Sequence, residues 1–520
     1  MTSLLRLLAL LGALLLAPPA IADPGDIAAA SRGVVRVVLI REEGGSASLV
    51  GHGSGFAVAP DLVVTNAHVV SNLRGDSSLV AGVVPSEGRG GFAAEIIAYS
   101  PRNDLALLRL SGGAALSPLT LFAGVPTDSE EVFAAGYPGN VDMAEGLSMT
   151  DLVSPQAAVK SRGYISAGRS SRQFDTILHT APIGAGNSGG PLLDACGRVL
   201  GVNSFGTVSD NGTDSAFYFA ISMREVAAFL KAAGVAPHSS GLPCTSIADL
   251  DRADAARSAD DQARLAAEQA ARATAKEQAL VKAQHDAELQ VLAERDNGLA
   301  LAALLLVAAL GAGGAAFVYG QRGNARVMKI AGGAAALMVF GAVITWLLRP
   351  PLGMIDERAK DIVADARASA APEADASNEA ASAATGPAKL ICVLDPQRSR
   401  VTVSDVTDVP VEWAPGGCVN GRTQYGLAAD GWSRVLVPQS EATISVTHFD
   451  PETRGYTVER FLMGLEAMTA ARAARAKLTP PICGADEVAA RQFGEAQQAI
   501  KGMLPPEPNE RLRYSCKPVP

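Results

Sequence analysis

The stretch Gly184-Ala185-Gly186-Asn187-Ser188-Gly189-Gly190-Pro191 presents one serine in a glycine-dense turn, and the apolar residues after it indicate a buried strand. A serine that attacks a carbonyl must stand clear of its own backbone. The amides of Gly186 and Ser188 must also point at the oxygen that becomes negative, and glycine makes such a turn easiest. The alternative interpretation is a tight hairpin with an incidental serine.

Two further residues supply what a nucleophilic serine needs, a base within reach and a group that holds the base in the right tautomer. His68 follows the apolar run 63–67, where a side chain can face a cleft. Asp104 enters the hydrophobic run 105–108 from a turn, where a half-buried carboxylate can accept the imidazole N–H. Singly, each has a plain structural explanation, but the order His, Asp, Ser favours catalysis.

Short β-branched runs with glycine or polar turns between them surround these residues and predict an all-β barrel or sandwich. The runs are 33–40, 55–64, 93–99, 105–110, 131–135, 176–179, 199–203 and 217–221. A helix is predicted at 222–233, with Ser222 as N-cap and Glu225 completing a capping box. We expect this first domain to span 23–241.

The whole chain is too long, at 520 residues, for a single core. Its net charge of −9 argues against a nucleic-acid partner. Residues 1–22 form a leucine-rich segment that ends in a small-x-small site, which predicts a secretory signal peptide; an uncleaved anchor is the alternative. Export favours disulfides, and the cysteines fall into two even blocks: Cys196 and Cys244, then Cys392, Cys418, Cys483 and Cys516.

The middle of the chain predicts a membrane hairpin on a helical stalk. Residues 247–296 are rich in Ala, Arg, Asp, Glu and Gln, and as one helix they would span roughly 75 Å. The stalk is either a self-associating coiled coil that makes a homo-oligomer or a solvated single helix. The uncharged segments 298–319 and 330–348 are long enough to cross a bilayer. The basic link 320–329 is then cytoplasmic, which puts both flanking domains outside the cytoplasm.

After the second span we expect a tether at 350–388 and a small disulfide-bearing α+β domain at 389–520, with helices near 458–476 and 485–503. We find no catalytic constellation in this domain. No CxxC or HExxH pattern occurs, so we predict no metal and no cofactor. The resulting location is a bacterial inner membrane, with both domains on the periplasmic side.

Four blocks of the first domain resemble the consecutive motifs of trypsin-like serine proteases of the HtrA/DegP type. They are GSGFAVAPDLVVTNAHVV (53–70), SPRNDLALLRL (100–110), AAGYPGN (134–140) and IGAGNSGGPLLD (183–194). The resemblance covers about 33–234 and implies two six-stranded barrels with the site between them. It implies that His68 is the general base, Asp104 the orienting acid, Ser188 the nucleophile, and the amides of Gly186 and Ser188 the oxyanion hole.

The same resemblance assigns Asn203, Ser204 and Phe205 to the edge of the primary specificity pocket. Pro182 stands where trypsins place an acidic residue, so we expect no Lys/Arg preference. His179 either faces that pocket or only ends a strand, and His52 is expected in a loop. The peptide-binding PDZ domain of the family is not evident. We therefore expect a membrane-anchored serine endopeptidase that cleaves exported or membrane proteins; the alternative is a protease-fold peptide-binding or sensor protein.

Overall fold

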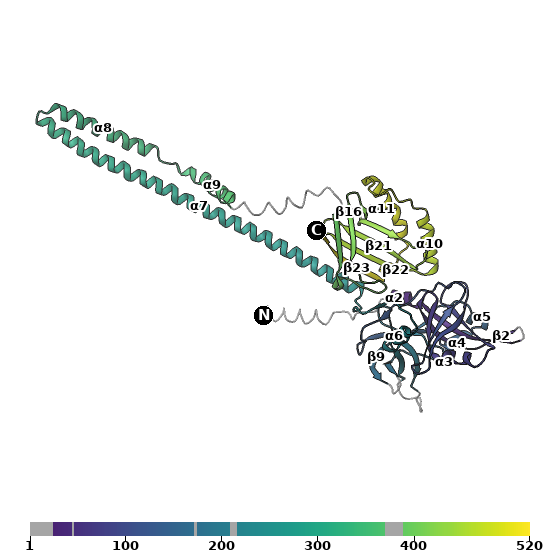
Figure 1. The fold of residues 1–520 in the computed structure, drawn as a ribbon. Coiled ribbons are helices and arrows are strands. Elements are labelled where there is room, and N and C mark those ends of the chain that lie inside the picture. The colour runs from purple at the N-terminus through teal and green to yellow at the C-terminus, as the bar shows by residue number, and fades with distance from the viewer. Residues whose placement is uncertain (1–23, 44–45, 171–173, 208–215, 370–387, 520) are drawn as a thin grey trace. The chain divides into compact units, whose positions relative to one another are not determined.

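The structure is a computed structural model that describes residues 24–43, 46–170, 174–207, 216–369 and 388–519 (Figure 1). The chain divides into two compact units. The first contains Met1–Asp254 together with Thr385–Pro520, and the second contains Ala255–Ala384. The predicted signal peptide, residues 1–22, lies outside the described residues, as does the part of the predicted tether at 370–387.

Six antiparallel strands close into the first barrel, in the order β1-β2-β3-β6-β5-β4. The strands are β1 (Val34–Glu43), β2 (Ser46–Ala59), β3 (Leu62–Thr65), β4 (Leu79–Pro85), β5 (Phe92–Ser100) and β6 (Leu105–Leu110). Branched and aliphatic side chains fill its core, because each strand alternates its side chains between the two faces. Thr65 pairs with Ala106, so residues just beyond the ends of β3 and β6 reach the same rim of the barrel.

The second barrel is a ring of six strands, β11-β8-β9-β10-β13-β12, closed by pairing of β12 with β11. Two short strands, β7 and β14, extend it beside β12. The strands are β7 (Leu121–Phe122), β8 (Glu131–Gly136), β9 (Val159–Ser170), β10 (Asp175–His179), β11 (Pro191–Leu193), β12 (Val199–Gly206), β13 (Tyr218–Ser222) and β14 (Ser239–Ser240). The predicted double-barrel fold is confirmed.

Short helices connect and flank the barrels. They are α2 (Pro24–Ser31), α3 (Ala67–Val70), η1 (Ser71–Arg74), α4 (Gly139–Glu145), α5 (Met149–Leu152) and α6 (Met223–Ala232). The predicted capping box of α6 is wrong, because the Ser222 side chain makes no capping bond. Glu225 instead accepts a hydrogen bond from the Asp175 amide (3.2 Å). The Glu225 side chain therefore binds the first residue of strand β10, in place of the predicted capping bond.

The second unit is helical. Helix α7 (Ile247–Gln321) is continuous, so no break separates the predicted stalk from the first predicted span. It is followed by α8 (Ala325–Leu347), η2 (Leu352–Met354) and α9 (Ile355–Ser369). Among the described residues, α7 and α8 are the two helices that are long and apolar enough to cross a membrane. The predicted tether, 350–388, contains helix α9 at residues 355–369.

Helix α9 packs against the stalk part of α7. Ala283 and Ala287 of α7 are buried with Ala359 of α9, and Arg358 bonds to Glu294 through both terminal nitrogens (2.8 and 3.2 Å). The C-terminal half of the stalk is the part with enough apolar residues for a seam. Helix α9 of the same chain therefore covers part of this apolar face of α7.

The C-terminal domain is built on one sheet of nine strands, in the order β18-β17-β16-β15-β23-β22-β21-β20-β19. Its elements are β15 (Ala388–Leu394), η4 (Pro396–Arg398), β16 (Val409–Ala414), β17 (Cys418–Val419), β18 (Thr423–Gln424), β19 (Gly426–Ala428), β20 (Gly431–Leu436), β21 (Thr443–Asp450), β22 (Gly455–Leu462), α10 (Leu465–Ala476), α11 (Glu487–Lys501) and β23 (Glu510–Pro518). The helix predicted from residue 458 begins only at Leu465, because Val458 pairs with Leu512 of β23.

All six cysteines form disulfides, as their even distribution predicted. The pairs are Cys196–Cys244, Cys392–Cys516 and Cys418–Cys483.

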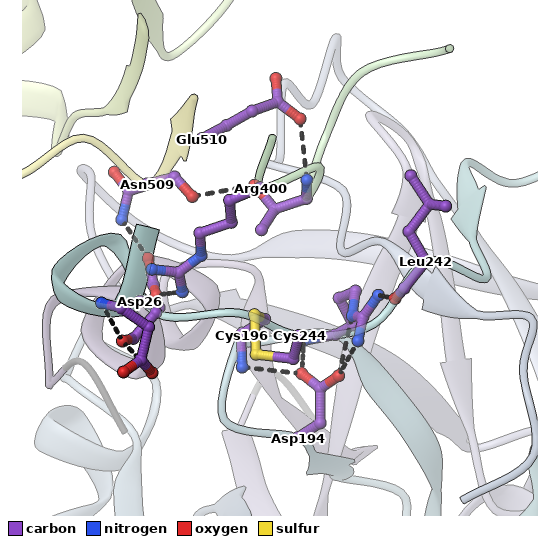
Figure 2. The surroundings of a disulfide bond; sticks show 12 residues. Asp26, Asp194, Cys196, Leu242, Cys244, Arg400, Asn509 and Glu510 are labelled. Carbon is purple, nitrogen blue, oxygen red and sulfur yellow. Dashed lines mark hydrogen bonds and ion pairs between the residues drawn. A yellow bond between two sulfur atoms is a disulfide. The ribbon is translucent and has the colours of Figure 1, made fainter. Parts of the chain in front are cut away.

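Polar contacts join the C-terminal domain to the two-barrel region within the first unit. Figure 2 shows Asp26 of α2 beside Arg400, with which it forms a buried ion pair, close to the Cys196–Cys244 disulfide. Asn509 donates to Asp26 Oδ1 (2.7 Å), and the Leu465 amide donates to Glu87 (3.1 Å). Residues from the two ends of the chain are therefore parts of one compact unit.

Candidate active site

Ser188 lies in the turn between β10 and β11, and the glycines of this turn take conformations that other residues avoid. Gly186 has φ +100° and Gly189 has φ +89°. A Cβ atom on Gly186 would lie 2.4 Å from the Tyr137 carbonyl oxygen, and one on Gly189 would lie 2.2 Å from that of Ser54. Glycine is therefore required at both positions by backbone conformation and by space.

The amides of the turn divide into two groups. Those of Asn187, Gly189 and Gly190 donate backbone hydrogen bonds of 2.8–3.0 Å. Within the described part of the chain, the amides of Gly186 and Ser188 donate none. Two neighbouring N–H groups beside the Ser188 side chain are thus left to bind an oxygen from another molecule.

His68 and Asp104 are in direct contact. His68 belongs to α3, and its Nδ1 lies 2.9 Å from Asp104 Oδ2 and 3.1 Å from Oδ1. Asp104, at φ +52° just before β6, also accepts the His68 amide (3.0 Å). Because the carboxylate accepts at Nδ1, this nitrogen carries the proton and Nε2 is left to act as a base. The imidazole is half exposed, with 51% of its surface accessible.

Ser204 of β12 connects this pair to Ser188. Its hydroxyl donates to Asp104 Oδ2 (2.7 Å), and its backbone carbonyl accepts from Ser188 Oγ (3.0 Å). The structure therefore brings the three predicted residues into one hydrogen-bonded group with a fourth member. Sequence reasoning placed Ser204 at a substrate pocket and missed its contact with Asp104, because no local pattern links β12 to the turn before β6.

Electrostatics keep Asp104 ionised. Burial raises the pKa of its carboxyl, but hydrogen bonds from His68 and Ser204, together with the charge of His68, outweigh burial and leave the pKa below its usual value. A carboxylate at this position can stabilise a positive charge on the imidazole.

The other residues predicted for the pocket lie at different depths. Asn203 is buried and donates to the Pro191 carbonyl (2.9 Å), so it supports the turn. Phe205 is 45% exposed and stacks on Phe219. His179 is buried at the end of β10, where burial lowers its pKa to about 4.

The expectation that His52 lies in a loop is wrong. His52 belongs to β2 and pairs with Val38 of β1. Its flanking glycines suggested a turn, but barrel closure requires the strand to continue through them. Among the residues that the structure describes, no group of three His, Cys, Asp or Glu side chains gathers to hold a metal ion.

Comparison with known proteins connects this geometry to a family. Residues 53–202 match the family model of the trypsin-like peptidase domain. The chain is 35% identical over 191 residues to the magnetosome formation protease MamE of Paramagnetospirillum magneticum, covering 34% of this chain and 23% of that protein. It is 34% identical over 156 residues to human serine protease HTRA4, covering 29% of this chain and 30% of that protein.

Among solved structures, the Rv3671c protease of Mycobacterium tuberculosis in its active form matches with 25% identity and a TM-score of 0.32, over 44% of this chain and 95% of that chain. This chain spans less than a third of the length of MamE or HTRA4. The matched region contains His68, Asp104 and Ser188. Residues 53–202 are a trypsin-like peptidase domain, and its relatives are serine proteases of the HtrA and MamE type.

Proposed function

We propose that this protein is a serine endopeptidase in which Ser188 is the nucleophile, His68 the general base and Asp104 the residue that orients the base. The observation that carries this proposal is the hydrogen-bonded series Ser188, Ser204, Asp104 and His68 beside two unbonded amides. These are the parts that acyl transfer requires, since a nucleophile, an oriented base and an oxyanion site must meet at one carbonyl.

The proposed reaction has two stages. Ser188 Oγ attacks the substrate carbonyl while His68 Nε2 takes its proton, and Asp104 stabilises the imidazolium. The carbonyl oxygen becomes negative and binds the amides of Gly186 and Ser188. His68 then gives the proton to the departing amine as the C–N bond breaks. In the second stage a water molecule attacks the acyl group as His68 takes its proton, and His68 then returns that proton to the Ser188 oxygen as the ester bond breaks.

One contact must change before the attack. Ser188 Oγ donates to the Ser204 carbonyl, so its hydroxyl must rotate to donate to His68 Nε2. Rotation about one side-chain bond reaches another staggered position without moving the backbone. The resting hydrogen bond also favours a second candidate function, a peptide-binding or sensor protein with little catalysis, in which this rotation does not occur.

We further propose that the protein is anchored in a membrane. Helices α7 and α8 each contain an apolar stretch long enough to cross a bilayer, and most residues of these stretches are exposed to the surroundings of the helices. Exposed apolar stretches of this length are stable in lipid and not in water. A pair of spanning helices would return the chain to the side on which it started. Joining of residues 1–254 and 385–520 in one compact unit supports this arrangement.

The substrates that fit this location are exported or membrane proteins. Phe205, the exposed aromatic residue at the predicted pocket edge, favours apolar side chains at the cleavage site. The seam between α7 and α9 is formed within one chain, so a homo-oligomer through the stalk would have to use other faces of α7.

The test is labelling of the full-length protein, purified in detergent, with a fluorophosphonate probe. We expect the wild type to be labelled and Ser188→Ala to remain unlabelled. Ser111→Ala, at an exposed serine of the first barrel, is the matched control and should be labelled like the wild type. Cleavage of unfolded casein should follow the same order. A folded wild type that binds casein but takes up no probe would support the binding protein instead.

A further inference from the structure

A second imidazole–carboxylate pair, His52 and Asp142, lies close to the turn that holds Ser188. His52 of β2 is mostly buried, and its Nε2 lies 3.1 Å from the Tyr137 carbonyl oxygen and 3.3 Å from Asp142 Oδ2. Both neighbours are acceptors, so Nε2 must carry a hydrogen. His52 therefore donates toward the segment between β8 and α4.

Asp142 is fixed from its other side. Arg36 of β1 is buried, and its Nη2 bonds to Asp142 Oδ1 (2.9 Å) and to Gln156 Oε1 (3.2 Å). Its guanidinium lies over the ring of Tyr137, 4.8 Å from the centroid. A buried carboxylate paired with a buried guanidinium has little freedom to move, so Asp142 Oδ2 stays beside His52 Nε2, whose hydrogen bond the Tyr137 carbonyl accepts.

The segment that His52 supports holds the turn. The Gly139 amide donates to the Ala185 carbonyl (2.8 Å). Ser54 accepts from the Tyr137 amide (2.9 Å) and donates to the Gly186 carbonyl (2.7 Å). The Ala185 carbonyl and the Gly186 amide belong to one planar trans peptide, so they point in opposite directions. Fixing that carbonyl therefore aims the Gly186 N–H away from Gly139.

The imidazole also occupies the space beside Gly186 of the turn. A Cβ atom on Gly186 would lie 2.8 Å from His52 Nε2 and 2.4 Å from the Tyr137 oxygen. Any side chain added at Gly186 would therefore collide with His52 and with the carbonyl to which His52 donates. No other side chain meets that position within the same distance.

We propose that His52, through its hydrogen bond to the Tyr137 carbonyl, is a positioning residue for the oxyanion-binding amide of Gly186; this inference rests on the proposed function. His52 does not touch the reacting atoms. It fixes the Tyr137–Gly139 segment, whose hydrogen bonds orient the Ala185–Gly186 peptide. Without the imidazole N–H, the Tyr137 carbonyl loses its donor and that peptide gains freedom to rotate, which costs the transition state one of its two hydrogen bonds.

The experiment compares His52→Leu, which removes the donor, with His52→Gln, which keeps an N–H of similar reach, in the full-length protein in detergent. We expect His52→Leu to lower kcat at least about tenfold with KM nearly unchanged. The affinity of a peptide boronic acid, whose serine adduct is a tetrahedral anion, should fall by the same factor. His52→Gln should recover most of both. An active wild type matched by an equally active His52→Leu would overturn the inference while leaving the proposed function intact.

A readout independent of turnover separates the two proposals. Amide hydrogen exchange of peptides covering 137–142 and 184–190 should accelerate in His52→Leu and not in His52→Gln. If the wild type proves inert toward the fluorophosphonate, the proposed function fails, and this exchange pattern alone decides the role of His52. Equal exchange in all three proteins overturns it. Should His52→Leu misfold, His52→Ser takes its place with the same expectations.

Discussion

Ser204 shows how a residue without catalytic chemistry can decide the state of one that has it. Its hydroxyl bonds to Asp104 Oδ2, and that bond is one of those that lower the pKa of the carboxyl. Ser204→Ala should therefore raise the pKa of Asp104 and loosen its hold on His68. A hydrogen bond to a charged group contributes roughly 1.5–3 kcal/mol, so we expect kcat/KM to fall about ten- to a hundredfold. Peptide hydrolysis measured from pH 5 to 9 tests this.

Ser204→Thr retains the hydroxyl and should stay within a few-fold of the wild type across the same pH range. Equal rates for Ser204→Ala and the wild type would mean that His68 alone orients Asp104.

His179 makes the stability of the fold depend on pH, although it takes no part in the proposed reaction. Burial lowers its pKa from 6.5 to about 4, so the unfolded chain binds a proton between these pH values that the folded chain does not. The free energy of unfolding therefore falls as the pH drops from about 6.5 to 4, by on the order of 3 kcal/mol from this group. His179→Gln, which does not titrate, should lose less stability over that range. Urea unfolding at pH 7 and pH 4.5 measures the difference, and identical losses would contradict it.

Among single residues, sequence patterns identify those whose roles follow from their neighbours in the sequence. His68, Asp104 and Ser188 each stand in a recognisable strand or turn setting, and hydrogen bonds through Ser204 connect Ser188 to the other two. Sequence patterns do not identify the roles of Ser204 and His52, because these roles come from contacts between elements far apart in the chain. The glycines around His52 predict a loop when read alone, whereas barrel closure makes the same residues a strand.

Among the elements, helix α2 is held in place by a residue from a distant part of the chain. Its Asp26 pairs with Arg400, and both side chains are almost wholly buried. Removing one partner of a buried pair leaves the other charge without compensation and typically costs about 3–5 kcal/mol. We expect Asp26→Ala to destabilise the first unit by that amount and to raise its sensitivity to added protease. Chemical unfolding of the full-length protein in detergent measures it.

The matched control is the double variant Asp26→Leu/Arg400→Met, which replaces the pair with apolar side chains and should regain most of the lost stability. A loss in the double variant equal to the sum of the losses of the single variants Asp26→Leu and Arg400→Met would show that the pair contributes nothing as a pair.

The elements that sequence patterns miss are those shaped by long-range pairing. No pattern in residues 24–31 indicates a partner near residue 400. The helix predicted from residue 458 contains a strand at its start, because β22 completes a sheet with β23, whose sequence lies about fifty residues later. Long periodic segments are different: α7 and α8 are predicted well, since their composition alone favours a helix.

At the scale of the whole molecule, the chain leaves its compact unit at residue 254 and rejoins it at residue 385. If α7 and α8 cross a membrane, both ends of the helical unit must then emerge on one side. Arg322, Arg326 and Lys329 lie in and around the turn between the helices, with no acidic residue among residues 320–329. Basic residues remain on the cytoplasmic side during insertion, so this turn should be cytoplasmic and the peptidase domain should face outward.

Labelling with a membrane-impermeant maleimide tests this arrangement. The native cysteines are all paired, so an introduced thiol is the reactive one. Gln321→Cys, at the end of α7, should react in inverted membrane vesicles and stay unreactive in spheroplasts. Ser111→Cys, on the first barrel, should behave in the opposite way. Reaction of both thiols from the same side would mean that the helices do not span the bilayer, and the proposed membrane anchoring would then be wrong.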